Sequence, residues 1–259
     1  MKIPSPGLGF WQISKEDAKR VFIEGYEVGY RHFDTAIAYR NESEIGEAIK
    51  ELNLKREDYW ITSKIPAEIK NYKDAKKAID ESLQRLGVEY LDLMLIHAPK
   101  PWALMFLPGP RFHKGNREVW RAMVEAKQEG KIKNLGVSNF NIEDIKNITN
   151  YSDEPIYANQ ILIHIGHVTK DVIDYCHQNN IIVEAYSPLG VGKLIDNEQI
   201  KKIAEKYNVS PARVCIKYVN ELDTIPLPRS RSKNHMQDNF NFEFELSKED
   251  KEYLDSLKI

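Results

Sequence analysis

Short apolar segments alternate along the chain with longer stretches in which apolar positions recur every three or four residues. The first pattern is typical of strands buried on both faces, and the second of amphipathic helices. In the stretch 74–86, the apolar residues share one helical face, and Gly87 follows it. The patterns predict strands at 7–12, 31–34, 59–64, 91–97, 132–137, 156–160, 181–186 and 224–227. They predict helices at 16–28, 42–52, 74–86, 117–129, 142–148, 170–178, 197–207, 211–221, 234–239 and 248–257.

Strands that alternate with helices predict a parallel sheet, because each helix returns the chain to the start of the next strand. The length of 259 residues matches a closed (β/α)8 TIM barrel, which typically needs about 250 residues. The alternative is an open Rossmann sheet, which begins with a Gly-x-Gly-x-x-Gly turn. The nearest match, GLGFWQ at 7–12, has no third glycine. We therefore expect one barrel in a single domain that spans residues 1–259.

Composition and charge narrow the class of protein. Hydrophobic residues make up 42% and charged residues 29% of the chain, and the formal net charge is −2. These values are typical of a folded domain and argue against a surface built to bind nucleic acid. No apolar stretch reaches the length of a membrane span, and the start lacks the apolar core of a signal peptide. We expect a cytoplasmic monomer or weak oligomer with no nucleic-acid or membrane partner.

The cysteines and histidines do not form a metal-binding pattern. Cys176 and Cys215 stand far apart in the chain, as is typical of proteins from a reducing compartment. His164 and His167 have His-x-x-His spacing, but a metal site needs further ligands. We expect no metal.

Ionisable side chains stand where the predicted strands end, which is where barrels carry their active sites. Asp34, Lys64 and His97 end the second, third and fourth strands, and Tyr39 follows in the loop after the second. Each alone is most simply a solvated loop residue, but together they suit proton transfer. An ammonium at Lys64 lowers the pKa of a neighbouring tyrosine, which is about 10 in water. A carboxylate at Asp34 holds that ammonium, and His97 can donate to an oxyanion.

Several longer motifs resemble those of the aldo-keto reductases. The segment GYRHFDTAIAYRNE at 29–42 resembles the first signature of that family, and IDESLQRLG at 79–87 with YLDLMLIH at 90–97 resembles the second. The runs GVSNF at 136–140 and AYSPLG at 185–190 are also typical of the family. The resemblance covers nearly the whole chain in order. It implies a (β/α)8 barrel that reduces a small-molecule carbonyl compound with NADPH or NADH.

By this resemblance the four strand-end residues form the catalytic set. Tyr39 is the general acid that protonates the carbonyl oxygen, and Lys64 lowers its pKa. Asp34 pairs with Lys64, and His97 orients the substrate carbonyl. The resemblance and the positions at the strand ends thus lead to the same residues.

The resemblance also implies where the nicotinamide lies. Ser138 and Asn139 end strand five, Gln160 ends strand six, and all three hold the carboxamide through hydroxyl and amide groups. Tyr186 ends strand seven and matches the aromatic residue that stacks on the ring. Without this context, a tyrosine beside an apolar strand is equally well explained by core packing.

Phosphate sites in barrels often follow strands seven and eight. Residues 187–193 offer backbone N–H groups there, and PRSRSKNH at 228–235 offers positive charge. This basic turn favours NADPH over NADH, although His235 stands where the family usually has arginine. The residues expected to contact the rest of the cofactor are Ser187, Leu189, Arg229, Ser230, Arg231, His235, Asp238 and Asn239.

The expected substrate pocket departs from the family pattern. Trp11 matches an aromatic residue of the family's pocket. The family usually has Trp-Pro after the histidine, whereas Ala98 follows His97 here, so Trp102 is the candidate for the missing wall. The aromatic and proline-rich segment 102–113 forms either a lid over the pocket or packing on the barrel rim.

Two other functions stay open from the sequence. Barrels of this family also serve as NADPH-binding regulatory subunits without catalytic activity, although the intact set of four residues argues against that role. Lys64 could instead be a Schiff-base nucleophile, which requires a lowered amine pKa. A neighbouring Asp34 carboxylate shifts that pKa the other way.

Overall fold

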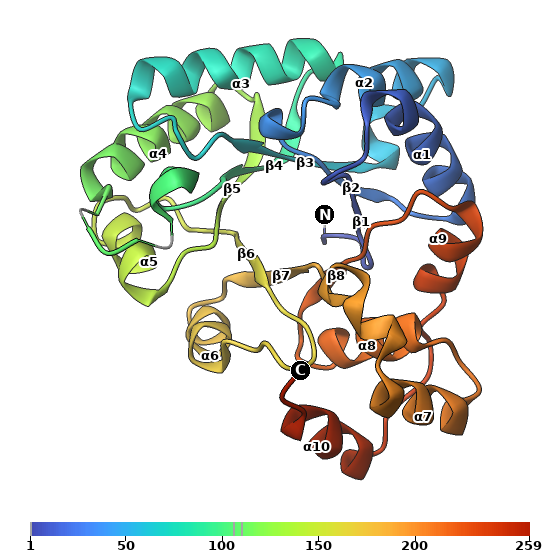
Figure 1. Ribbon diagram of the computed structural model, residues 1–259. Helices are drawn as coiled ribbons and strands as arrows, with labels where there is room; N and C mark the ends of the chain where they lie inside the picture. The colour runs from blue at the N-terminus through green and yellow to red at the C-terminus, as the bar shows by residue number, and fades with distance from the viewer. Residues whose placement is uncertain (1, 106, 110) are drawn as a thin grey trace.

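Eight parallel strands follow one another around a barrel, and each pairs with the next in chain order. The structure is a computed structural model that describes residues 2–105, 107–109 and 111–259. Figure 1 looks along the barrel, with the strands at the centre and the helices around them. The predicted (β/α)8 fold is confirmed. The strands are β1 (Leu8–Gly9), β2 (His32–Asp34), β3 (Trp60–Ile65), β4 (Leu91–Ile96), β5 (Ile132–Ser138), β6 (Ala158–Leu162), β7 (Ile182–Tyr186) and β8 (Ile225–Leu227).

Amphipathic helices cover the outside of the strands. Polar side chains fix several of their first turns: Ser14 and Asn71, for example, accept hydrogen bonds from backbone N–H groups at the starts of α1 and α3, as N-cap residues do. The α-helices are α1 (Lys15–Val28), α2 (Glu42–Glu51), α3 (Tyr72–Leu86), α4 (His113–Gln128), α5 (Ile142–Thr149), α6 (Lys170–Gln178), α7 (Glu198–Tyr207), α8 (Pro211–Asn220), α9 (Lys233–Phe240) and α10 (Lys248–Ser256). Short 3-10 helices are η1 (Ile37–Tyr39), η2 (Arg56–Asp58), η3 (Trp102–Leu104) and η4 (Gly190–Asp196).

Two strands differ from the prediction in ways that affect the site. Strand β1 ends at Gly9 rather than at 12, because the chain turns where the N–H of Ile13 donates to the carbonyl of Phe10. Trp11 therefore lies in this turn and not on the strand. Strand β6 runs on to Leu162, which pairs with Tyr186 of β7, so Gln160 lies within the strand and not at its end. Helix α4 begins at His113 instead of 117.

The first and last strands meet and close the barrel. The N–H groups of Gly7 and Gly9 donate to the carbonyls of Pro226 and Pro228, at 3.0 and 2.9 Å. This contact needs a residue without a side chain, because a Cβ at Gly7 would lie 2.5 Å from the Leu227 side chain and 2.6 Å from that of His32. Glycine at this position therefore permits the closure.

The barrel interior is divided between an apolar floor and a polar layer. At the end where the strands begin, Ile3, Trp60, Leu93, Leu95 and Ala158 form a small buried cluster. A much larger apolar core lies between the strands and the helices. Further along β3 and β6, the inward positions carry the polar side chains of Lys64 and Gln160, which form the base of the site described below.

The segment after β4 is described only in part. The predicted lid or rim segment 102–113 begins with η3, but Phe106 and Pro110 of that segment lie outside the described residues. Among the helices of the described residues, none combines the length and the apolar character that a membrane crossing requires.

The closure contact predicts a large effect of one added methyl group. Gly7→Ala should lower the free energy of unfolding by about 1–3 kcal/mol, because the new Cβ forces Leu227 or His32 out of place. The control is Gly9→Ala, two residues further along the chain, where the nearest atom to a Cβ would be a carbonyl oxygen at 3.5 Å. We expect it to change stability by less than about 0.5 kcal/mol. Urea denaturation measures both, and equal losses would show that the close approach at Gly7 is not the cause.

Candidate active site

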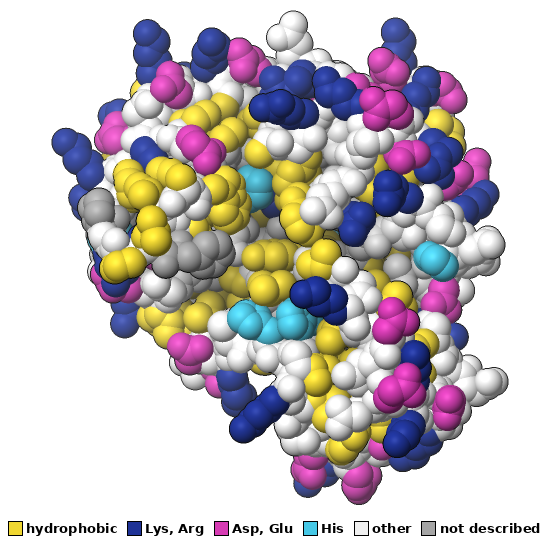
Figure 2. Space-filling view, viewed as in Figure 1, with side chains coloured by type: hydrophobic (Ala, Val, Ile, Leu, Met, Phe, Trp, Pro, Cys, Tyr) yellow, Lys and Arg dark blue, Asp and Glu magenta, His cyan; other side chains and the backbone are white. Residues whose placement is uncertain are grey.

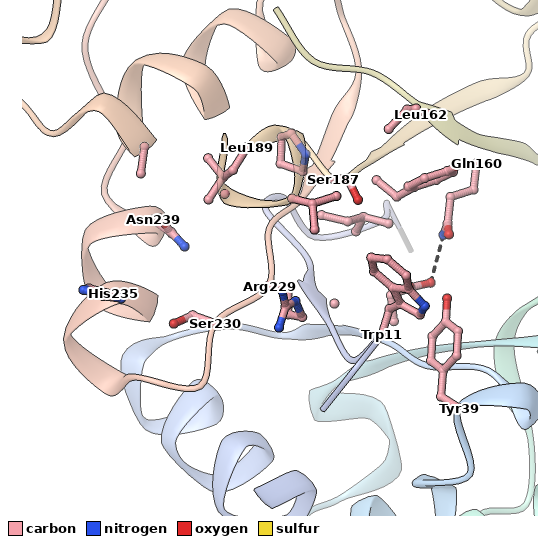
Figure 3. A pocket seen from close by; sticks show the side chains of 18 of the residues that line it. Trp11, Tyr39, Gln160, Leu162, Ser187, Leu189, Arg229, Ser230, His235 and Asn239 are labelled. Carbon is pink, nitrogen blue, oxygen red and sulfur yellow. Dashed lines mark hydrogen bonds between the residues drawn. The ribbon is translucent and has the colours of Figure 1, made fainter. Parts of the chain in front are cut away.

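A cavity of about 890 Å³ opens at the end of the barrel where the strands finish. Figure 2 shows this face of the molecule, hollowed at its centre and walled largely by hydrophobic side chains. In Figure 3, Tyr39 and Gln160 lie at one end of the cavity, and Ser230, His235 and Asn239 lie at the other. The cavity is therefore elongated, with one end at Tyr39 and Gln160 and a second end that is polar and partly basic.

A buried ion pair lies beneath the first end. The Lys64 ammonium donates to Asp34 Oδ1 at 2.6 Å and to the Thr35 carbonyl at 2.8 Å. Both side chains of the pair are buried. Burial acts to lower the pKa of Lys64, but Asp34 and Tyr39 outweigh it, and the pKa is raised overall. Lys64 is therefore a charged group, which opposes the Schiff-base hypothesis because that role needs a neutral amine.

Tyr39 lies at the end of η1, with its ring centre 5.0 Å from the Lys64 nitrogen. Burial raises the pKa of Tyr39, and the Lys64 ammonium opposes that rise. The Lys64 ammonium thus acts to lower the pKa of Tyr39, as expected from the sequence, but the loss of hydration on burial raises that pKa by more. Tyr39 is accordingly a protonated phenol beside a fixed positive charge.

His97 directly follows β4, and its ring lies edge-on to the Tyr39 ring, with centres 5.6 Å apart. Burial, with a further contribution from Lys64, lowers the pKa of His97 to about 3. The imidazole is therefore neutral at physiological pH and offers one N–H donor and one acceptor. Its Nδ1 is buried without a hydrogen-bond partner. A neutral ring that lines the cavity beside Tyr39 can donate to an oxygen placed there.

Hydroxyl and amide groups occupy the wall beside this end. Asn139 donates to the Ser138 hydroxyl at 3.0 Å and to the His97 carbonyl at 3.1 Å. The Tyr186 hydroxyl donates to Asn139 Oδ1 at 2.8 Å, and the Ser138 hydroxyl donates to the Gln160 carbonyl at 2.9 Å. All four residues line the cavity. The structure thus brings together the residues that the sequence predicts to hold a carboxamide and a ring.

The other end of the cavity combines one partly buried cation with polar side chains. Of the residues predicted for the rest of the cofactor, the cavity is lined by Ser187, Leu189, Arg229, Ser230, His235, Asp238 and Asn239.

Arg231 is the exception to that prediction. Its side chain is exposed and does not line the cavity, and its carbonyl accepts from Arg20. The neighbouring Lys233 turns toward α1, where its ammonium lies 2.6 Å from a Glu27 oxygen. The positive charge of this turn at the cavity therefore comes from Arg229.

Two tryptophans stand at the mouth. Trp11 and Trp102 line the cavity and are 42% and 39% exposed. The Trp102 ring lies edge-on to His97, with centres 5.2 Å apart, while Ala98 is buried. Trp102 thus supplies an aromatic wall beside His97, as the sequence suggests.

The distant pair His164 and His167 forms an isolated bridge, and within the described residues no three His, Cys, Asp or Glu side chains are grouped to hold a metal ion.

Sequence reasoning missed a buried acid beneath the site, Glu184. It is fully buried on β7, two residues before Tyr186, and accepts a hydrogen bond from Gln160 at 2.9 Å. Burial, together with the charge of Asp34, raises the pKa of Glu184 to about 8. The available signal was a single carboxylate within the otherwise apolar run IIVEAY, on the same face of the strand as Tyr186.

The sequence matches the model of the "Aldo/keto reductase family" over residues 4–259. The glyoxal reductase of Bacillus subtilis (strain 168) is 35% identical over 259 residues, which covers 99% of this chain and 90% of the relative. Glycerol 2-dehydrogenase (NADP(+)) of Saccharomyces cerevisiae is 34% identical over 276 residues, with coverage of 99% and 88%. Among solved structures, the aldose reductase from Schistosoma japonicum has a TM-score of 0.88 at 33% identity and coverage of 99% and 89%.

The raised pKa of Glu184 predicts a pH-dependent stability difference. Between about pH 5 and 8 the folded protein keeps a proton on Glu184, whereas the unfolded chain loses it near the ordinary value of 4.5. Because the folded state binds more protons, this carboxyl lowers stability as pH rises, by up to about 1.4 kcal/mol per pH unit. Glu184→Gln has no such proton. Its free energy of unfolding minus that of the native protein should therefore increase from pH 5 to 8. Urea denaturation at four pH values tests this, and a constant difference would mean that Glu184 is ionised in the fold.

Proposed function

This chain belongs to the aldo/keto reductase family, and we propose that it reduces an aldehyde or ketone to an alcohol with NADPH. The observation that carries the proposal is the meeting of Tyr39, Lys64, Asp34 and His97 at one end of one cavity. Family membership supports carbonyl chemistry in general. The roles of the individual residues and the choice of cofactor are our inference.

The cavity fits a dinucleotide cofactor in both size and chemistry. Its volume of about 890 Å³ lies in the range of cofactor sites. Ser138, Asn139 and Gln160 would hold the nicotinamide carboxamide, and Tyr186 would lie against the ring. Arg229 would contact the adenosine 2′-phosphate, which NADPH carries and NADH lacks, as arginine does through paired N–H groups. When bound, the reduced cofactor supplies the hydride, and the protein supplies position and electric field.

The protein's own residues would deliver the proton. Tyr39 carries a proton that its buried environment retains, and it would release that proton to a carbonyl oxygen held within hydrogen-bond reach. The phenolate that remains would lie beside the Lys64 ammonium, whose positive charge attracts it and offsets part of the cost of burial. Asp34 keeps the ammonium charged and in place. The neutral His97 would donate to the same oxygen and so orient the carbonyl.

The remaining walls indicate an uncharged substrate. Around Tyr39 and His97 the cavity is lined by Trp11, Trp102 and Leu162, which offer contact area and no cation to pair with a carboxylate. The related proteins named glyoxal reductase and glycerol 2-dehydrogenase (NADP(+)) support a small carbonyl compound or alcohol and the NADP form of the cofactor. Cys176 and Cys215 are buried free thiols, which supports the proposal that the protein acts in the cytoplasm.

Replacement of the acid tests the proposed role of Tyr39. We expect Tyr39→Phe to lower kcat for aldehyde reduction by at least about 100-fold, because the variant lacks the phenolic proton that would pass to the carbonyl oxygen, while NADPH still binds. Tyr157→Phe, at the opposite end of the barrel beside Trp60, is the control and should keep its activity. The assay follows NADPH consumption over a panel of aldehydes and ketones. If the native protein binds NADPH tightly but turns over none of them, the non-catalytic regulatory role is correct instead.

The choice of cofactor is tested at Arg229. Arg229→Met should weaken NADPH binding by roughly 10- to 100-fold, the usual range for the loss of charged hydrogen bonds, and should leave NADH binding almost unchanged. Lys233→Met removes the same charge from the same turn, but that ammonium pairs with Glu27, so we expect little effect on either cofactor. Titrations of both cofactors measure this. An equal or lower KM for NADH in the native protein would contradict the preference for NADPH.

A further inference from the structure

Gln160 is held from beneath the cavity by two carboxyl groups. Its amide nitrogen donates to Asp34 Oδ1 at 2.8 Å and to Glu184 Oε2 at 2.9 Å, and the dashed line in Figure 3 marks the first of these bonds. Strand register explains the second, since Gln160 and Glu184 are directly paired between β6 and β7. One amide group thus joins the catalytic ion pair to a buried acid that has no part in the proton transfer described above.

The two acceptors determine which way the Gln160 amide faces. An NH2 group has two hydrogens to donate, and both are used by oxygen atoms of Asp34 and Glu184. If the amide were reversed, its carbonyl oxygen would lie against Asp34, whose carboxylate also only accepts. The nitrogen therefore stays below, and the oxygen is the only atom of this amide left for a ligand in the cavity.

The surroundings of Glu184 bear on its protonation state. Its second oxygen, Oε1, is buried without a hydrogen-bond partner and lies 3.5 Å from His32 Nε2. The Nδ1 of His32 lies 3.2 Å from the Pro4 carbonyl, which requires a hydrogen on Nδ1. Burial lowers the pKa of His32 to about 4, so Nε2 carries a lone pair and not a second hydrogen.

A protonated carboxyl is compatible with these contacts. In that state Oε2 acts as a carbonyl oxygen that accepts from Gln160, and the hydrogen on Oε1 faces Nε2 of His32. This nitrogen also lies 3.3 Å from the Thr62 hydroxyl. The charged groups nearest to Glu184 are Asp34 and Lys64, which already neutralise one another. A neutral Glu184 therefore leaves no unbalanced charge inside the barrel, where an unpaired charge is costly.

We propose that Glu184 is a positioning residue that fixes the amide of Gln160 with its oxygen toward the cavity, so that the site selects a nicotinamide that carries an NH2 donor. This inference rests on the proposed function, because it assumes that the cavity binds NADPH or NADP+. It assigns Glu184 no contact with the cofactor or the substrate. Its effect is that the oxygen of the Gln160 amide, and not the NH2 group, faces the carboxamide.

The test compares two cofactors that differ in this donor alone. NADP+ carries a carboxamide with an NH2 group, whereas its 3-acetylpyridine analogue carries a methyl ketone and keeps only the carbonyl oxygen. Dissociation constants of both are measured by the quenching of tryptophan fluorescence, since Trp11 and Trp102 line the cavity. Glu184→Met removes the acceptor and retains a side chain of similar length. We expect it to weaken NADP+ binding about fivefold to tenfold, the effect of losing one oriented hydrogen bond, and the analogue less than about twofold.

The conservative variant is the matched control. Glu184→Gln presents an oxygen to Gln160 and an NH2 group to His32, as the protonated acid does, so we expect both dissociation constants to stay within about twofold of the native values. Loss of the discrimination in this variant would overturn the proposal. Equal weakening of the two cofactors in Glu184→Met would also overturn it, because that result indicates general damage to the site.

A second variant covers the case in which Glu184→Met does not fold. Glu184→Asp keeps the carboxyl but is one methylene shorter, so its oxygen cannot reach Gln160, and the same selective loss of NADP+ binding is expected. An unchanged ratio of the two dissociation constants would contradict the proposal. If the native protein binds neither cofactor, the proposed function itself fails, and this outcome is distinct from a failure of the role of Glu184.

Discussion

The ion pair between Lys64 and Asp34 is the interaction on which the other parts of the site depend. It places one positive charge inside a barrel whose walls exclude water. That charge acts on Tyr39, lowers the pKa of His97, and is held by a carboxylate that also accepts from Gln160. A buried pair of this kind contributes little net stability, because desolvation offsets the attraction between its charges. Its value lies in the field that it creates at the mouth of the barrel.

The interior of the barrel shows how that field is kept at one end. The floor, with Ile3, Trp60 and Leu93, is apolar and closely packed, and it provides the stability that a polar layer lacks. Above it, Lys64, Gln160 and Glu184 face inward from β3, β6 and β7 and bond to one another or to Asp34. Almost all their polar atoms find partners inside this layer, which limits the cost of burying them.

The ends of β2, β3 and β4 could be located from the sequence to within one residue, whereas contacts across the barrel could not. Lys64 and His97 stand out as ionisable residues at or beside the ends of predicted strands, and parallel strands bring such residues to one end of a sheet. The role of Glu184 depends on its register against Gln160, which no local pattern reveals. Arg231 looked equivalent to Arg229 because both lie in one basic turn. The direction of each side chain is set by tertiary packing, and only Arg229 faces the cavity.

The closure at Gly7 also bears on how the protein is made. Strand β1 leaves the ribosome before the other strands of the barrel, yet the N–H groups of Gly7 and Gly9 find their acceptors in and directly after β8, the last of these strands to be made. Until β8 has been synthesised, the nascent sheet keeps open edges that can pair with other chains. Newly made protein therefore passes through a period of exposure to aggregation that ends only when the ring of strands is joined.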